Sequence, residues 1–144
     1  MGVLLSHHHS ESKIATTYGI PVQSHSRGHS YGSYSLGGKD SAFVIDLSKM
    51  NTIIVNQTTW RATIGGKTCL KGVTEGLYNQ GKCTIAQEMC PQVGIGRQAT
   101  VGGQGPLSRM YGLTLDHIME MKVILTDGTI TKVNKEMNLD LFFV

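Results

Sequence analysis

A glycine-rich segment between Glu88 and Asp116 constrains this chain more than any other part of the sequence. It reads EMCPQVGIGRQATVGGQGPLSRMYGLTLD and has glycines at positions 94, 96, 102, 103, 105 and 112. Glycine loses more backbone freedom on folding than any other residue, so this density indicates turns with positive φ or a close approach of the main chain to a ligand. Apolar residues such as Val93, Val101 and Leu113 recur throughout the segment. They favour an ordered loop over a flexible linker.

Serine, threonine and glutamine lie between these glycines, which predicts that bare backbone N–H groups face an anionic or polar ligand. Neither common nucleotide-binding motif is present, however. Gly103-Gln104-Gly105 is followed by Pro106-Leu107-Ser108, so the third glycine of GxGxxG is missing, and no GxxxxGK[ST] pattern occurs. The sequence therefore argues against a Rossmann fold and against a P-loop.

The composition is that of a globular domain. The chain has 144 residues, of which 40% are apolar and 16% charged, enough for one domain with a core of its own. The net charge is +3 and the lysines and arginines are scattered, so no nucleic-acid surface is indicated. No apolar run reaches membrane-spanning length, and the apolar stretch near the N-terminus is too short for a secretory signal.

Histidines and cysteines are the side chains most often used for metals and disulfides. His7, His8 and His9 are consecutive on a free end without the fixed geometry of a zinc site, so we expect residues 1–11 to be a disordered lead-in and no metal to bind. The cysteines are odd in number and lack CxxC spacing, which indicates neither a disulfide framework nor a zinc knuckle. They are Cys69, Cys83 and Cys90.

The pattern of apolar residues predicts an α+β fold. Helices are expected over 12–18 and 67–80 and from 138 onwards, and strands over 20–24, 42–47, 52–55, 60–64 and 82–86. The helix over 67–80 is the best defined, because Leu70, Val73 and Leu77 share one face and Gly81 follows as a stop signal. The strand over 42–47 is of the compact apolar kind that is usually buried.

The segment from His117 to Val133 predicts a β-hairpin. Asp127-Gly128 is expected to supply a two-residue turn with positive φ between antiparallel strands. Apolar residues alternate before the turn, and we expect them on the buried face: Met121, Val123 and Leu125. A further helix starts at Asn138 and has no body, which predicts a truncated domain.

Two loops carry the side chains best suited to chemistry. His29 lies in RGHSYGSYSLGG, among small residues that leave its ring accessible, and Cys90 lies between Met89 and Pro91. Taken alone, such a histidine is usually an ordinary surface residue and such a cysteine a buried thiol. Because each lies next to a glycine-rich loop, the pair becomes a candidate for binding one ligand.

With these residues the sequence resembles the PCMH-type FAD-binding domain of the vanillyl-alcohol-oxidase and p-cresol-methylhydroxylase superfamily. It is most similar to the berberine-bridge-enzyme-like and glucooligosaccharide-oxidase-like branch. The matching segments are 19–50, 59–82, 89–128 and 138–143, in the family's order. The resemblance implies that residues 12–144 form part of this α+β domain, in which the cofactor lies between two small α/β subdomains. It also implies that the substrate domain is absent.

The resemblance further implies the residues of an FAD site. The family's GHSY histidine bonds to the flavin 8α-methyl carbon, and in one subgroup a cysteine before proline bonds to flavin C6. These positions correspond to His29 and Cys90, and two such bonds would raise the redox potential of the flavin. The other implied contacts are Arg27, Gly28, Ser30, Tyr31, Gly94, Ile95, Gly96, Gly102, Gly103, Gly105, Gly112, Leu113 and Asp116.

Arg27 and Arg97 depart from the family pattern, because relatives commonly have glycine at these positions. The bulk of these side chains would oppose a close approach of the cofactor, whereas their charge would bind its pyrophosphate, and the sequence leaves both alternatives open. It also leaves the catalytic base unassigned. The candidates near the loops are Tyr31, Tyr34, Tyr111 and His117.

Two functions follow from the resemblance. The first is an FAD-linked oxidoreductase, in which an alcohol, sugar or secondary-metabolite carbon gives a hydride to flavin N5 and dioxygen reoxidises the flavin. The second is a catalytically silent remnant that binds flavin weakly or not at all. The implied partners of a full-length relative are a small-molecule substrate and dioxygen, with no nucleic acid and no membrane, and relatives are often secreted. Because the substrate domain is missing, we expect this chain alone to be inactive.

Overall fold

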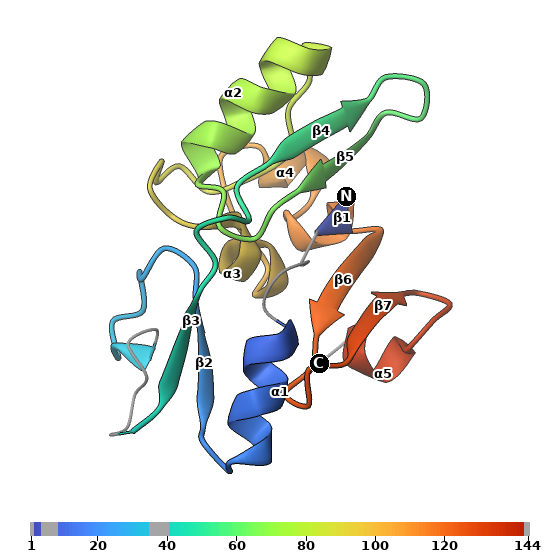
Figure 1. Cartoon of the computed structure of the whole chain (residues 1–144). Helices are drawn as coiled ribbons and strands as arrows, with labels where there is room; N and C mark the ends of the chain where they lie inside the picture. Colours follow the sequence, from blue (N-terminus) through green and yellow to red (C-terminus); the bar gives the residue numbers. More distant parts are fainter. Residues whose placement is uncertain (1, 4–8, 35–40, 143–144) are drawn as a thin grey trace.

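The chain forms two sheets with helices packed around them (Figure 1), and the computed structural model describes residues 2–3, 9–34 and 41–142. The strands are β1 (Gly2–Val3), β2 (Val22–His25), β3 (Phe43–Asp46), β4 (Ile53–Asn56), β5 (Arg61–Ile64), β6 (Glu120–Ile124) and β7 (Ile130–Asn134). The helices are α1 (His9–Thr17), α2 (Leu70–Gly81), α3 (Ile95–Thr100), α4 (Ser108–Tyr111) and α5 (Leu139–Phe142), with a 3₁₀ turn η2 (Leu115–His117). This mixture confirms the predicted α+β class.

The strand pairing explains why the chain has a long polar loop after β2. One sheet has the order β4-β5-β1-β6-β7, and the other contains β2 and β3 alone. β2 and β3 are parallel, with Val22 opposite Phe43 and His25 opposite Asp46. Parallel strands cannot be joined by a tight turn, so the connection must return along their full length. This connection carries the GHSY sequence.

The hydrophobic core lies between α2, the five-stranded sheet and α3. Its buried side chains are Ile64, Leu70, Val73, Leu77, Ile95, Ala99 and Ile118. The prediction that Leu70, Val73 and Leu77 share the buried face of one helix is confirmed. α2 lies over β4 (Figure 1), and Gly76 allows this close approach, because a Cβ there would lie 2.6 Å from Ile53 Cδ1. Since α3 belongs to the glycine-rich segment, Ile95 and Ala99 anchor that segment in the core.

Several sequence-based expectations were wrong. β3 is mostly exposed, with only Ile45 buried, because a two-stranded sheet has little around it to cover both faces. Residues 82–86 form no strand, and the Ala86 carbonyl accepts a hydrogen bond from the Thr114 hydroxyl instead (2.7 Å). The glycine-rich segment is partly the expected loop, over 88–94 and 101–107, but it also contains the short helices α3 and α4.

The N-terminal region also differs from the expected disordered lead-in. Gly2–Val3 pairs in parallel with both β5 and β6, and α1 begins at His9, before the expected start at Ser12. A two-residue strand gives no periodic signal, because only pairing with strands far along the chain defines it. His7 and His8 lie outside the described residues, as does Phe143 in the expected C-terminal helix, whose start is confirmed by α5.

The predicted hairpin is present, but its turn and its burial differ from expectation. β6 and β7 are antiparallel, from Glu120 opposite Asn134 to Ile124 opposite Ile130. The Leu125 N–H donates to the Thr129 carbonyl (2.9 Å), so three residues form the loop, and Gly128 alone among them has positive φ (82°). This is a type I turn followed by a left-handed glycine. Every residue of β6 is half-buried, so the alternation marks no single buried face.

Candidate cofactor site

A groove of about 670 Å³ lies between the loop after β2, helix α3 and strand β6. α3 occupies the centre of the molecule, between the two sheets (Figure 1). The residues of the predicted FAD site that line the groove are Arg27, Gly28, His29, Ser30, Gly94, Gly96 and Gly103. The structure therefore brings the GHSY loop and the glycine-rich segment together at one cavity.

Cys90 lies beside this groove. It is exposed, and with Gly105 it lines an adjoining open depression. Glu88 and Gln104 line both the groove and the depression, so the two spaces are neighbours.

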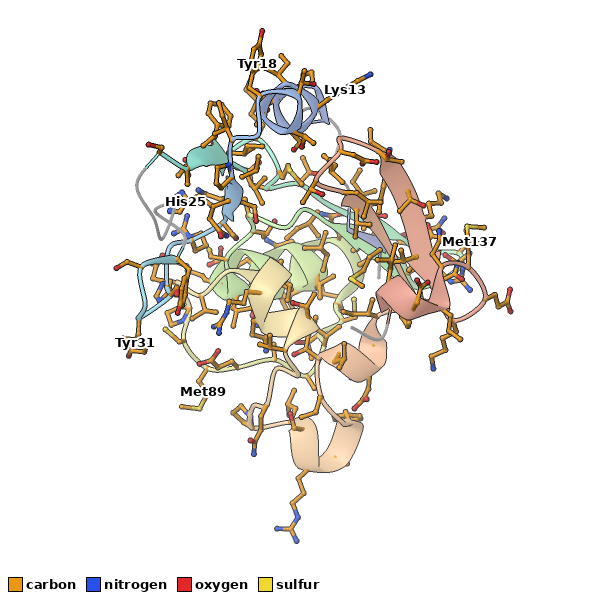
Figure 2. The ribbon with its side chains drawn as sticks, turned by 90° about the horizontal axis from the view of Figure 1, so that it is seen from below. Lys13, Tyr18, His25, Tyr31, Met89 and Met137 are labelled. Atoms are coloured by element: carbon orange, nitrogen blue, oxygen red, sulfur yellow. The ribbon has the colours of Figure 1, made fainter. Side chains whose placement is uncertain are left out.

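The other predicted site residues do not line the groove. Tyr31 is fully exposed and points away from the body of the molecule (Figure 2), whereas Ile95 is fully buried in the core. Asp116 accepts a hydrogen bond from the Leu113 N–H (2.7 Å), and a Cβ at Gly112 would lie 2.6 Å from the Asp116 carboxylate. Gly112, Leu113 and Asp116 form the turn after α4, and Gly102 lies between α3 and α4.

The glycines of the segment have close neighbours within the protein itself. A Cβ at Gly94 would lie 2.6 Å from Ser26 Oγ, and a Cβ at Gly96 would lie 2.8 Å from the Gly66 carbonyl oxygen. A Cβ at Gly105 would overlap the carbonyl oxygen of Gln87. The expected close approach of the backbone is therefore real, and at these positions the protein's own loops make it.

A buried polar network lies at the wall of the groove. Thr114 is fully buried, and its hydroxyl has two possible acceptors, the carbonyl oxygens of Ala86 (2.7 Å) and Gly103 (3.0 Å). Because its single hydrogen goes to a carbonyl, the Thr114 oxygen accepts from Gln98 Nε2 (2.9 Å). The side-chain oxygen of Gln98 is thereby directed away from Thr114.

Gln98 Oε1 is buried and has no hydrogen-bond partner among the described residues. Its side chain lines the groove although the residue is only 4% exposed. An unpaired buried acceptor costs about 1–3 kcal/mol, so a donor that reached this oxygen would remove that cost. Gln98 belongs to no motif in the sequence, and its one local signal is its position one helical turn after Ile95.

The charged residues that line the groove are predominantly basic. Arg27, Arg97 and Lys122 line it, together with one carboxylate residue, Glu88. The Arg97 side chain has no hydrogen bond or ion pair within the described part of the chain. A cleft lined by charges of one sign concentrates ligands of the opposite sign. The groove therefore favours an anionic ligand.

An ion-pair cluster fixes the base of the GHSY loop. Asp46 accepts from Lys67 Nζ (2.9 Å), and His25 Nδ1 lies 3.6 Å from the other carboxylate oxygen. The hydrogen bond from Lys67 lowers the pKa of the Asp46 carboxyl below its usual value. This stabilisation is present above the unfolded-state pKa and is lost as the pH falls through the lower folded-state pKa. It is small, because Asp46 is exposed.

The described residues contain neither a cluster of metal ligands nor a membrane-spanning helix. No group of three or more histidine, cysteine or acidic side chains among them is arranged to hold a metal ion. No helix in the described part of the chain is long and apolar enough to span a membrane.

Comparison with known proteins matches residues 9–134 to the family model described as "FAD binding domain". The FAD-linked oxidoreductase sorD of Penicillium rubens is 38% identical over 131 residues, which are 91% of this chain and 27% of sorD. The carbohydrate oxidase of Microdochium nivale superposes with a TM-score of 0.91 at 30% identity, over 97% of this chain and 30% of the oxidase.

A third similar protein is the glucooligosaccharide oxidase of Acremonium strictum, whose structure is described with a 6-S-cysteinyl, 8α-N1-histidyl FAD. It superposes with a TM-score of 0.85 at 32% identity, over 93% of this chain and 28% of the oxidase. This chain thus spans between a quarter and a third of the length of these proteins. The family model nevertheless covers most of the chain, including both segments that line the groove. The chain belongs to the family of FAD binding domains, in the branch that contains carbohydrate oxidases and other FAD-linked oxidoreductases.

Proposed function

We propose that this chain binds FAD in the groove between the GHSY loop and α3, as the flavin-binding part of an oxidoreductase. The observation that carries this proposal is that His29, the basic residues and Gln98, whose side-chain oxygen is unpaired, all line one cavity. Each component matches a different part of FAD. The cations suit its pyrophosphate, the Gln98 oxygen suits an N–H or O–H group, and His29 suits the covalent bond implied by the family.

The dimensions and charge of the groove fit this ligand. Its volume lies within the range of roughly 300–1,000 Å³ that is usual for small-molecule sites. Arg27 and Arg97 both line it, and Arg97 has no partner in the described structure. Of the two alternatives left open by the sequence, pyrophosphate binding is therefore favoured over exclusion of the cofactor.

We further propose that His29 and Cys90 attach the flavin covalently, as in the histidyl and cysteinyl FAD of the glucooligosaccharide oxidase. Each bond would replace one hydrogen on the side-chain nitrogen or sulfur and one hydrogen on a flavin carbon. Dioxygen would take up both hydrogens and become hydrogen peroxide. The exposure of His29 and of Cys90 leaves both free to reach a ligand in the groove or beside it.

Bound FAD would supply a two-electron acceptor for substrate oxidation. By similarity to the carbohydrate oxidase and to sorD, we propose an alcohol carbon of a sugar or secondary metabolite as the donor, with dioxygen as the final acceptor. Of the four candidate bases, only Tyr34 lines the groove. We assign no base and expect the 144-residue chain alone to release no hydrogen peroxide from such substrates.

The proposal is tested by incubating the purified chain with excess FAD and removing unbound flavin by gel filtration. We expect flavin absorbance to elute with the protein. Protein that elutes without flavin would contradict the proposal and would instead support the silent remnant.

Replacing Arg97 by glutamine is expected to weaken FAD binding by about tenfold, because one charge-assisted contact to the pyrophosphate, worth roughly 1.4 kcal/mol, is lost. Riboflavin has no phosphate, so its affinity should be unchanged. Both affinities are measured by flavin fluorescence in a protein that also carries His29→Ala and Cys90→Ala, so that no covalent bond forms and binding stays reversible. Arg109→Gln is the matched control, because Arg109 is exposed on α4, away from the groove lining. Equal weakening of FAD and riboflavin would refute a pyrophosphate contact.

A further inference from the structure

We infer that Arg27 and Gln92 form a clamp that holds the Cys90 segment against the GHSY loop and so positions Cys90 relative to His29. This inference rests on the proposed function, since it concerns the two residues proposed to hold FAD. Arg27 lies two residues before His29, and Gln92 lies two residues after Cys90. A contact between Arg27 and Gln92 therefore joins the two segments next to their proposed attachment points.

The clamp consists of two hydrogen bonds from one guanidinium group. Arg27 Nη2 donates to the side-chain oxygen of Gln92 (2.9 Å), and Arg27 Nε lies 3.4 Å from the Gln92 backbone carbonyl oxygen. The planar fork of arginine can reach both acceptors at once, whereas the single ammonium group of lysine cannot. The contact thus fixes both the backbone and the side chain of Gln92, two residues after Cys90.

The aliphatic part of Arg27 packs beside the same segment. A Cβ at Gly94 would lie 2.9 Å from Arg27 Cγ, so only glycine permits this approach. On its other side, the segment is bonded to the start of α2. The Leu70 N–H donates to the Val93 carbonyl (3.0 Å), and the Lys71 N–H donates to the Pro91 carbonyl (3.1 Å). Cys90 therefore precedes a short stretch held between α2 and Arg27.

The GHSY loop has an anchor that does not depend on this clamp. Ser26 Oγ donates to the Gly66 carbonyl (2.7 Å). Removal of the clamp should therefore leave His29 in place and release Cys90 alone. Arg27 is in this sense a positioning residue.

The test measures how fast Cys90 is attached when the purified full chain is incubated with FAD and dioxygen. After denaturation, unattached Cys90 is alkylated and counted by peptide mass spectrometry, and attachment at His29 is measured on the same samples. We expect Arg27→Ala and Gln92→Ala each to slow attachment at Cys90 by roughly 10- to 100-fold, the effect of a displacement of about 1 Å. At saturating FAD, attachment at His29 should keep its rate in Gln92→Ala, because Gln92 does not line the groove.

The variants that accompany this test separate the clamp from a general loss of structure. The double variant should be no slower than Arg27→Ala, because Arg27→Ala already removes both hydrogen bonds and Gln92→Ala removes one of them. Gln92→Glu keeps a side-chain acceptor oxygen and the backbone carbonyl and should retain the wild-type rate, while Arg27→Lys should restore it only partly. Arg109→Ala is the control for loss of an exposed arginine and should change nothing. An unchanged rate of Cys90 attachment in Arg27→Ala would overturn the clamp while leaving FAD binding intact.

A second measurement uses the flavin-free chain, so it holds even if no flavin attaches. Hydrogen exchange should become at least tenfold faster over residues 90–94 in Arg27→Ala and in Gln92→Ala, while residues 73–81 of α2, which do not bond to this segment, stay unchanged. Wild-type exchange rates over residues 90–94 in both variants would contradict the clamp independently of the cofactor.

Discussion

Replacing His29 and Cys90 together by alanine is expected to release all flavin to the supernatant when the FAD-loaded chain is precipitated with acid. Each single replacement should leave the flavin in the pellet, because one covalent bond remains and acid breaks only noncovalent contacts. The measurement is the visible absorbance of the pellet and supernatant after precipitation. The effect is all-or-none, since FAD has no other proposed attachment point.

Cys69→Ser provides the control for loss of a thiol. Cys69 is half-buried at the start of α2, where serine is also well tolerated. The flavin of the Cys69→Ser variant should stay in the pellet, as in the wild type. Flavin that remains in the pellet of the His29 and Cys90 double variant would show that other residues hold the cofactor.

Gly103→Ala is expected to lower the free energy of unfolding by about 3 kcal/mol. Gly103 has φ of +77°, a left-handed conformation that costs an alanine roughly 1–2 kcal/mol. A Cβ there would also clash with Gln98 Nε2 and the Thr114 hydroxyl and lie 2.7 Å from Thr114 Cβ. Overpacking of this kind costs about 1–3 kcal/mol. Both side chains are buried, so they have little room to move aside.

Gly19→Ala isolates the two contributions. Gly19 has φ of +64°, and no atom lies within 4 Å of the position where a Cβ would stand. It should therefore show only the backbone cost, about 1 kcal/mol. Urea unfolding followed by circular dichroism gives both values. Equal losses in the two variants would mean that the Gln98–Thr114 network does not restrict position 103.

The parts of the fold that the sequence predicted correctly are those with a local signal. α2 follows from the spacing of Leu70, Val73 and Leu77, and the β6–β7 hairpin follows from alternation around a turn sequence. β1 and the parallel pairing of β2 with β3 depend on partners far along the chain, and no short-range pattern encodes them. Asp127-Gly128 predicted a two-residue turn, and the structure has a three-residue loop. The Asp127 side chain favours this loop, because it accepts a hydrogen bond from the Thr129 N–H (2.8 Å).

In the candidate site, too, some features were predictable from the sequence and others were not. The residue types around His29 and the glycine-rich segment predicted that these two regions act together, and they do line one groove. The contacts that shape the groove were not predictable, because Arg27 with Gln92 and Gln98 with Thr114 are pairs formed only by the tertiary fold. The glycines gave a correct signal of close approach, but the sequence alone could not distinguish a ligand from the protein's own backbone.

Peptide mass spectrometry of the FAD-loaded wild-type chain tests the central claim most directly. After digestion, the account predicts one species in which the peptide containing His29 and the peptide containing Cys90 are joined through a single FAD. Recovery of both peptides unmodified, or of FAD attached to any other residue, would contradict it.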